Sequence, residues 1–367
     1  MATLSVEERT ALQDAVVRLL ADKSTEADVR RVMESERGYD PELWSQLADM
    51  GVAGLIVEEA LGGAGAGPLE LEAVMEAAGA VLLCSPLLAS SVLAATLLQA
   101  LGDEEAKARL LPGIAAGSLI ATVALTDDTG TWTEEGVSVT ASKADPPLLA
   151  GAANYVIHGQ NADVLLVLAR AEDGLAVFEV DPKDSGVTIE ALPTFDHTLR
   201  LARVVFDKAA GRRLQGKAGA AMRSALDMAL VALAGEQAGA SQRCLEFTID
   251  YAKNRYQFGR AIGSFQAIKH MAADLLLETE SAISAARHAA AKLAEGAKDA
   301  DAAVSLAAFA CAEAFTRTTA DAIQMHGGIA FTWDHPAHLY LRRARADAQL
   351  FGAPAVHRER FLQALGA

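Results

Sequence analysis

The fold of this chain can be worked out from the stretch Arg255-Tyr256-Gln257-Phe258-Gly259-Arg260-Ala261-Ile262-Gly263-Ser264-Phe265-Gln266. It lies between two long helical patterns, at about 216–253 and 264–296. Gly259 and Gly263 stand close together there, and glycine pairs of this kind mark turns. The stretch therefore predicts a corner between two long helices.

The side chains around this corner are suited to an anion. Arg255 offers a guanidinium, and Gln257 and Gln266 offer amides beside the start of the second helix. A diphosphate would meet charge-assisted donors and the positive end of a helix dipole at such a place. The alternative is an ordinary polar turn between helices, which is the commoner meaning of the pattern taken alone.

A second cluster reads Gln324-Met325-His326-Gly327-Gly328-Ile329-Ala330-Phe331. A long helical pattern stops at its Gly-Gly pair, as helices commonly do. Gln324 could hydrogen-bond a ligand, and the two glycines would let that ligand approach the backbone. A plain helix stop is again the simpler alternative.

Outward from these clusters, three regions differ in pattern, and together they predict an α+β fold. Residues 1–117 carry helix signals, among them the capping box Ser5-Val6-Glu7-Glu8. Residues 118–208 hold short runs of Val, Leu and Ile separated by Gly, Asp and Pro, which predicts an antiparallel β-barrel or sandwich. Residues 209–367 hold four long helical segments, as in a four-helix bundle.

Composition excludes several functional classes. A formal net charge of −16 disfavours nucleic-acid binding. Three scattered cysteines without a CxxC pair argue against disulfides and structural zinc, and favour a reducing, cytoplasmic location. The uncharged stretch 77–102 is broken at Cys84-Ser85-Pro86 and lacks basic flanks, so it predicts two buried helices rather than a membrane span.

Several familiar motifs are not satisfied. The glycines of 62–67 do not have GxGxxG spacing and lie between helical segments, so a flexible turn is expected there. No Glu has a His three residues later, and no metal site is expected. Neither GxSxG nor a Walker loop is present, which removes the usual signals of a hydrolase or a nucleotidase.

In combination, the two clusters resemble the acyl-CoA dehydrogenase family. The matching features are Arg-x-x-Phe-Gly followed by Gln, then Gln-x-x-Gly-Gly, and an opening that runs from Trp44 to Gly63. The helix–β–helix order extends the resemblance over essentially the whole chain. It implies FAD held between the β domain and the bundle, a carboxylate that removes the α-proton of an acyl-CoA thioester, and transfer of the β-hydrogen as hydride to the flavin.

The resemblance also implies an oligomer, a dimer or a tetramer with a homologous subunit, because several positions match residues that hold a neighbouring subunit's FAD. They are Arg255, Gln257, Phe258 and Gln266 toward the pyrophosphate, and Gln324, Gly327 and Gly328 along the same cofactor. The implied substrate is an acyl-CoA, and the family usually passes its electrons to an electron-transfer flavoprotein.

The departures from the family pattern concern the catalytic base and the flavin face of the β domain. The two usual base positions are occupied by Ala229 and Phe351, and neither side chain can accept a proton. The usual Trp-x-Thr of the flavin-facing strand is replaced by Tyr155 and Ile157. The usual glycine loop is reduced to 126–132.

Glu236 is a candidate for a substitute base. It lies in a small, apolar helical run, about two turns after Ala229 on a similar face, where burial would raise the pKa of a carboxyl. The alternative, which the rarity of unpaired buried carboxylates favours, is a structural Glu paired with an Arg or a helix end.

In the family that this chain resembles, the motifs retained here contact the FAD of a neighbouring subunit. The motifs that are lost here contact the subunit's own flavin and substrate. This resembles one half of a bacterial two-gene dehydrogenase acting on bulky or steroid-derived CoA thioesters, with a partner that supplies the base. The alternatives are a non-catalytic subunit that only completes the partner's FAD site, and a flavin monooxygenase or acyl-CoA oxidase relative.

Overall fold

The computed structural model describes residues 5–366, which form two compact units. The β unit comprises residues 32–67 and 84–229, and the helical unit comprises residues 5–31, 68–83 and 230–366. The predicted classes of structure are found in the predicted order, with helices first, strands next and long helices last. The boundaries 1–117, 118–208 and 209–367 stay a prediction, since the compact units are assembled from interleaved segments.

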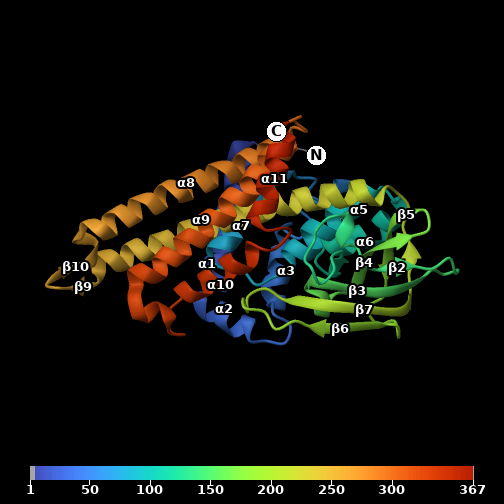
Figure 1. Ribbon diagram of the computed structural model, residues 1–367, viewed down its shortest axis with the longest axis horizontal. Helices are drawn as coiled ribbons and strands as arrows, with labels where there is room; N and C mark the ends of the chain where they lie inside the picture. Colours follow the sequence, from blue (N-terminus) through green and yellow to red (C-terminus); the bar gives the residue numbers. More distant parts are fainter. Residues whose placement is uncertain (1–4, 367) are drawn as a thin grey trace. The chain divides into compact units, whose positions relative to one another are not determined.

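One mixed sheet organises the β unit. Its order is β6-β7-β3-β2-β4-β5-β8, with β1 beside β4. The strands are β1 Ala121–Ala124, β2 Thr140–Ala141, β3 Leu148–Ile157, β4 Val164–Ala171, β5 Gly174–Val180, β6 Val187–Ala191, β7 Leu201–Ala210 and β8 Arg212–Arg213. Figure 1 shows β6, β7 and β3 in one layer and β4, β2 and β5 in another. Leu149, Leu165 and Phe178 are among the side chains that fill the core between strands.

The antiparallel expectation holds for most of this sheet and is wrong for two pairs. β3 pairs antiparallel with β7, and β4 pairs antiparallel with β5, but β1 and β2 each run parallel to β4. All of β1 is buried, and the π-helix η2 Leu87–Ala94 covers it, with Ser90 Oγ accepting a hydrogen bond from the Ala121 amide. A strand buried on both faces is the setting in which parallel pairing occurs.

Helices of the β unit begin where the sequence signals them. Helix α3, Pro41–Asp49, is capped by Asp40, whose carboxylate accepts from the amides of Glu42 and Leu43. The uncharged stretch 77–102 contains the end of α4, Pro68–Ala80, then η2 and α5, Ala95–Leu101. Both helical pieces are buried, which confirms two core helices rather than a membrane span. Helix α6, Glu104–Ala115, and the short turns η1, Glu59–Leu61, η3, Glu134–Gly136, and η4, Gly159–Asn161, complete this unit.

The helical unit is built on three long helices. They are α7 Ala218–Asn254, whose first turns belong to the β unit, α8 Gln266–Ala294 and α9 Ala300–His326. Shorter helices join them: α1 Val6–Lys23, α2 Glu26–Met33, α4, α10 Ala337–Asp347 and α11 Pro354–Ala364. Figure 1 shows α8 and α9 side by side. The four predicted long segments are therefore helical, and α11 is an addition to them.

Helix α7 is long and apolar enough to cross a membrane, with a mean hydropathy of 1.2 over its most apolar window. However, 72% of that window is buried inside the protein, as expected for the central helix of a globular core. Glycines bring α4 directly against it. A Cβ added at Gly79 would lie 1.9 Å from the Glu236 carbonyl oxygen, and one at Gly239 would lie 1.9 Å from the Glu76 carbonyl oxygen.

Candidate functional site: a cofactor-binding corner

The predicted corner is a short hairpin between two helices. Strands β9, Tyr256–Gln257, and β10, Arg260–Ala261, pair antiparallel and lead through η5, Ile262–Ser264, into α8. The hairpin tip, Phe258 and Gly259, has φ values of 53° and 77°. Two successive left-handed residues are the geometry of a tight two-residue hairpin turn. Figure 1 shows this hairpin at the far end of α7 and α8.

Phe258 occupies an unusual position for an aromatic residue. Its side chain is 91% exposed, and its left-handed backbone costs a non-glycine residue about 1–3 kcal/mol. Its ring meets the Phe265 ring edge-on at 6.2 Å, and the Arg260 guanidinium lies 4.0 Å above the Phe265 ring. Strain of this kind is usually retained at functional surfaces, so the tip is suited to contact with a ligand or another chain.

The second cluster lies at the same end of the helical unit. Met325 of α9 packs in one core cluster with Leu245 and Ala252 of α7, Leu275 of α8 and Ile262 of the corner. Gln324 directly precedes Met325 in the chain, and the Gly-Gly pair follows it after His326. The fold thus brings together the two motifs that the sequence had suggested separately.

The residues of this end fit the polar part of a dinucleotide. The side chains of Arg255, Gln257 and Gln324 are exposed, and none has a hydrogen-bond partner within residues 5–366. The first turn of α8 follows Phe265, which provides no side-chain cap for the backbone amides. An unpaired guanidinium, two amides and an uncapped helix N-terminus are a donor set that suits a pyrophosphate.

Gln266 and the glycines complete this surface. The Gln266 amide nitrogen lies 2.7 Å from His270 Nε2, one turn along α8. A Cβ added at Gly327 or Gly328 would meet nothing within 4 Å, so the backbone is open to a ligand. Gly327 also has a left-handed φ of 66°, which a side chain would disfavour.

Sequence reasoning missed a ring cluster behind this surface. His326 is buried, its ring stacks on Tyr251 with 4.3 Å between centroids, and His335 lies 4.5 Å away. Burial lowers the pKa of both histidines. The position of these rings in the sequence could have revealed the cluster. Tyr251 precedes Arg255 by one helical turn, and His326 directly precedes the Gly-Gly pair.

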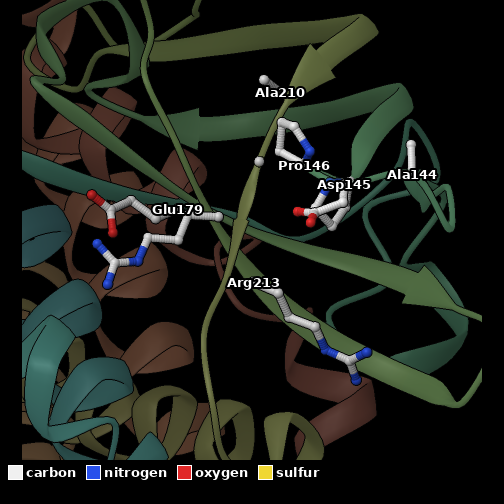
Figure 2. Close-up of a pocket in the computed structure, with 9 residues that line it drawn as sticks. Ala144, Asp145, Pro146, Glu179, Ala210 and Arg213 are labelled. Carbon is white, nitrogen blue, oxygen red and sulfur yellow. The ribbon is translucent and has the colours of Figure 1, made fainter.

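A groove in the β unit has the size of a ligand site but not its chemistry. It encloses about 590 Å³ between 144–147 and 210–213. Arg212 pairs with Glu105, Arg213 with Asp173, and Glu179 with Arg109. Figure 2 shows the charged ends of Glu179 and Arg213 on opposite sides, turned away from each other. The charges of Glu179, Arg212 and Arg213 are therefore already neutralised by neighbouring side chains.

Glu236 is engaged in a buried ion pair. Its Oε1 lies 2.5 Å from a guanidinium nitrogen of Arg343 on α10, and both side chains are less than 10% exposed. The sequence analysis gave such a pairing of Glu236 with an Arg as the alternative to a role as catalytic base. Within residues 5–366, no group of three or more His, Cys, Asp or Glu is arranged to hold a metal ion.

Comparison with known proteins decides the family. Residues 6–118 match the model of the acyl-CoA dehydrogenase N-terminal domain, and residues 218–366 match that of the acyl-CoA dehydrogenase C-terminal domain. The chain belongs to the acyl-CoA dehydrogenase family. Members of this family are FAD-dependent oxidoreductases, and the corner described above has the donors that this cofactor needs.

Individual members of the family are similar over nearly the whole chain. Acyl-CoA dehydrogenase IpdE2 of Mycolicibacterium smegmatis is 35% identical over 349 residues, covering 95% of this chain and 96% of the relative. Among solved structures, the ChsE4-ChsE5 complex from Mycobacterium tuberculosis has a TM-score of 0.90 at 31% identity, covering 100% and 99% of the two chains. A variant of the Tcur3481-Tcur3483 steroid ACAD has a TM-score of 0.88 at 31% identity, covering 98% of each.

The two positions that the sequence analysis predicts to correspond to the family's base are apolar and buried. Ala229 is 0% exposed within α7. Phe351 is 4% exposed and keeps a left-handed φ of 62° in front of Gly352. The loop thus retains a strained shape, while its side chain can neither accept nor donate a proton.

β3, the strand that the resemblance predicts to face the flavin, is hydrogen-bonded to a loop of the same chain. β3 and β7 shift register between Ala153 and Val156, and Tyr155 sits there with a φ of 54°. The Tyr155 hydroxyl donates to the Asp128 carbonyl at 3.2 Å, and the Thr126 hydroxyl donates to the Thr131 carbonyl at 2.6 Å. The Thr126–Thr131 bond closes the loop on itself. The Tyr155 bond and a bond that the Asn154 amide donates to the Thr126 carbonyl at 2.7 Å hold loop 126–132 against β3.

Proposed function

We propose that this chain is one subunit of an FAD-dependent acyl-CoA dehydrogenase, in which a homologous partner supplies the catalytic base and this chain completes the partner's FAD site. One observation carries the proposal. The donor set at Arg255, Gln257 and Gln324 is exposed and unpaired within residues 5–366, whereas Ala229 and Phe351 occupy both base positions.

In the bound complex, FAD supplies the acceptor for the hydride that leaves the β-carbon of the acyl-CoA. Arg255 and the N-terminus of α8 would neutralise the pyrophosphate, and Gln257, Gln266 and Gln324 would donate hydrogen bonds along it. Gly327 and Gly328 would allow the cofactor to approach the backbone. The exposed Phe258 would exclude water from the edge of the same site.

Similarity to two-chain structures supports a heteromeric assembly. The ChsE4-ChsE5 complex is named for two different chains, and the Tcur3481-Tcur3483 variant is described as a steroid ACAD. We propose a bulky or steroid-derived acyl-CoA as the substrate of the assembled enzyme. An electron-transfer flavoprotein as acceptor, a cytoplasmic location and the three domain boundaries are parts of the same proposal.

The second candidate is a subunit that completes the FAD site but takes no part in turnover. The pairing of Glu236 with Arg343 favours it, because that carboxylate is engaged in the protein's own structure. The two candidates differ in one measurable respect. If this chain contributes to turnover, variants at its cofactor edge change the rate per bound FAD, whereas in a subunit that takes no part in turnover they change only the FAD content.

The first experiment compares the chain purified alone with the chain co-expressed with the product of a neighbouring dehydrogenase gene. The proposal expects a colourless protein alone, and a yellow, active hetero-oligomer with the partner, by visible spectrum and native mass. A yellow, active homo-oligomer would overturn it. Oxygen consumption without another electron acceptor would instead indicate the oxidase or monooxygenase relative.

A further inference from the structure

The segment from Gly327 to Pro336 leaves α9, passes through the short helix η6, Gly327–Phe331, and enters α10. It exposes large apolar side chains, with Ile329 at 46%, Phe331 at 76% and Trp333 at 51%. Ala330 is its buried anchor, packed in one core cluster with Ile323 and Ala337. His326 directly precedes the segment, and His335 lies near its other end.

The two histidine rings are packed among aromatic side chains of α7. Tyr251 stacks on His326, and Phe247 lies 5.7 Å from the His326 ring and 6.2 Å from the His335 ring. The two imidazoles lie 4.5 Å apart, centroid to centroid. The beginning and the end of the segment are thus joined through one ring-on-ring contact.

Backbone hydrogen bonds suit the neutral form of both rings. His326 Nδ1 lies 2.8 Å from the Ala322 carbonyl, so this nitrogen carries the proton and donates. His326 Nε2 is then an acceptor, and it is buried without a partner among residues 5–366. His335 Nδ1 accepts from the Ala337 amide at 3.2 Å, which requires that nitrogen to be unprotonated.

A proton added to either ring would disturb this arrangement. On His326 it would go to the buried Nε2, where no acceptor among the described residues awaits it. On His335 it would go to Nδ1 and displace the Ala337 amide. In both cases a positive charge would face a second imidazole 4.5 Å away, beside the buried His326 and the half-buried His335. Charges are screened less well there than in water.

Charged groups on neighbouring elements act on the pair in both directions. On α2, Arg30 disfavours a charged His335 and Glu26 favours it. On α10, His338 has Arg342 beside it, and both Arg30 and Arg342 disfavour its charged form. Burial is the largest cause that lowers the pKa of His326, His335 and His338.

We propose that His326 and His335 form a proton-operated clasp, which holds segment 327–336 closed while both rings are neutral and releases it when one is protonated. Because the folded pKa values are lowered from the ordinary 6.5, protons favour the open form. The stability of the closed form is fully present above pH 6.5 and is lost progressively as the pH falls below it. Acidification would then loosen Gly327 and Gly328. A resulting change in FAD binding rests on the proposed function, whereas the clasp itself does not.

Trp333 is a built-in reporter of this segment. Its ring lies 5.0 Å from the Arg342 guanidinium and meets the His338 ring edge-on at 4.7 Å. The full chain is titrated between about pH 8 and 5, the range in which histidine changes charge. The Trp333 signal is obtained by subtracting the spectrum of Trp333→Phe. Iodide quenching reports its exposure, and far-UV circular dichroism monitors the helices.

The expected result is a rise in Trp333 quenching that sets in below pH 6.5, with unchanged helix content. His335→Phe keeps a ring in the cluster but cannot titrate, so the rise should disappear and the segment should stay closed. His326→Gln should also remove the rise. The matched control is His288→Gln on the exposed face of α8, which should behave like the parent chain.

Three outcomes would overturn the clasp. The first is Trp333 quenching that does not change with pH in the parent chain, and the second is an unchanged rise in His335→Phe. A rise lost only in His338→Gln would assign the switch elsewhere and equally reject the pair. The measurement needs neither FAD nor a partner, so its failure leaves the proposed function standing, and failure of the proposed function leaves the clasp standing.

Discussion

The corner at 255–266 and the strand around Tyr155 differ in what they leave open. At the corner, Arg255 and Gln257 point their donors outward with no partner in the described part of the chain. At the strand, the Tyr155 hydroxyl is bonded to the Asp128 carbonyl, and loop 126–132 lies against β3. One region leaves its donors unpaired and the other is satisfied by its own chain, which is the contrast that the proposed function expects of a subunit completing its neighbour's site.

This contrast also explains why the missing base need not mean missing function. A chain that completes another subunit's site needs donors at its edge, and the helical unit has kept them. It has no need of a proton acceptor at Ala229 or Phe351, and apolar side chains fill those buried positions. Four substitutions test the contrast between the open and the closed region, and they follow in order of expected effect.

The largest effect is expected from Arg343→Ala. Removing one partner of a buried ion pair leaves Glu236 with an uncompensated charge, which costs about 3–5 kcal/mol of the free energy of unfolding. Urea unfolding of the purified chain measures it. Glu236→Gln should cost less and leave turnover of the co-expressed complex intact. Loss of turnover in a folded Glu236→Gln complex would make Glu236 a catalytic base. The helical unit would then supply a base as well as donors to the cofactor.

Arg255→Ala tests the open region directly. A hydrogen bond to a charged group contributes about 1.5–3 kcal/mol, so the complex should bind FAD about tenfold to a hundredfold more weakly. Fluorescence titration of the apo complex with FAD measures the change, and the unfolding midpoint of the chain should not move. Lys253→Ala, at an exposed position on the same helix end, is the control. Equal weakening of FAD binding in both variants would mean that Arg255 acts only through its general positive charge and not through a specific contact.

Glu72→Gln tests the interior of the helical unit. Burial, with Glu76 beside it, raises the pKa of Glu72 to about 8. The folded state then holds a proton that the unfolded state releases above its ordinary 4.5, so stability falls as the pH rises from 4.5 to about 8. The variant should unfold at higher urea at neutral pH, with a gain on the order of 2 kcal/mol, and show a flatter pH profile.

The control for Glu72→Gln is Glu280→Gln, at an exposed position on α8. It should leave both the midpoint and the pH profile of the parent chain unchanged. A pH profile that Glu72→Gln does not flatten would show that another group of the chain carries the dependence.

The smallest effect is expected from Tyr155→Phe in the closed region. It removes one neutral hydrogen bond, worth about 0.5–1.5 kcal/mol, and should loosen loop 126–132 without unfolding the sheet. Hydrogen exchange of the loop amides measures this, with Tyr256→Phe at the exposed hairpin as the control. If the loosened chain alone then binds FAD, the Tyr155 contact is what keeps this strand closed. Continued absence of FAD would mean that more than this bond is missing.

Local signals in the sequence identified most elements of the fold. Asp40 before Pro41 starts a helix, Ser5 and Glu8 form the capping box, and the break near Pro86 divides two buried helices, because these features depend on neighbours a few residues away. The pairing of β1 with β4 could not be predicted in this way. Their parallel alignment depends on η2 covering β1, a contact between segments about thirty residues apart in the chain.

Residue identity at a known spacing was enough to indicate the family, the two cofactor motifs and the loss of both usual base positions. The folded chain was needed to show that Met325 and Ile262 share one core, which brings those motifs to the same end. It was also needed to pair Glu236 with Arg343 and to place His335 against His326. These are contacts between side chains distant in the chain, and packing, rather than local propensity, selects them.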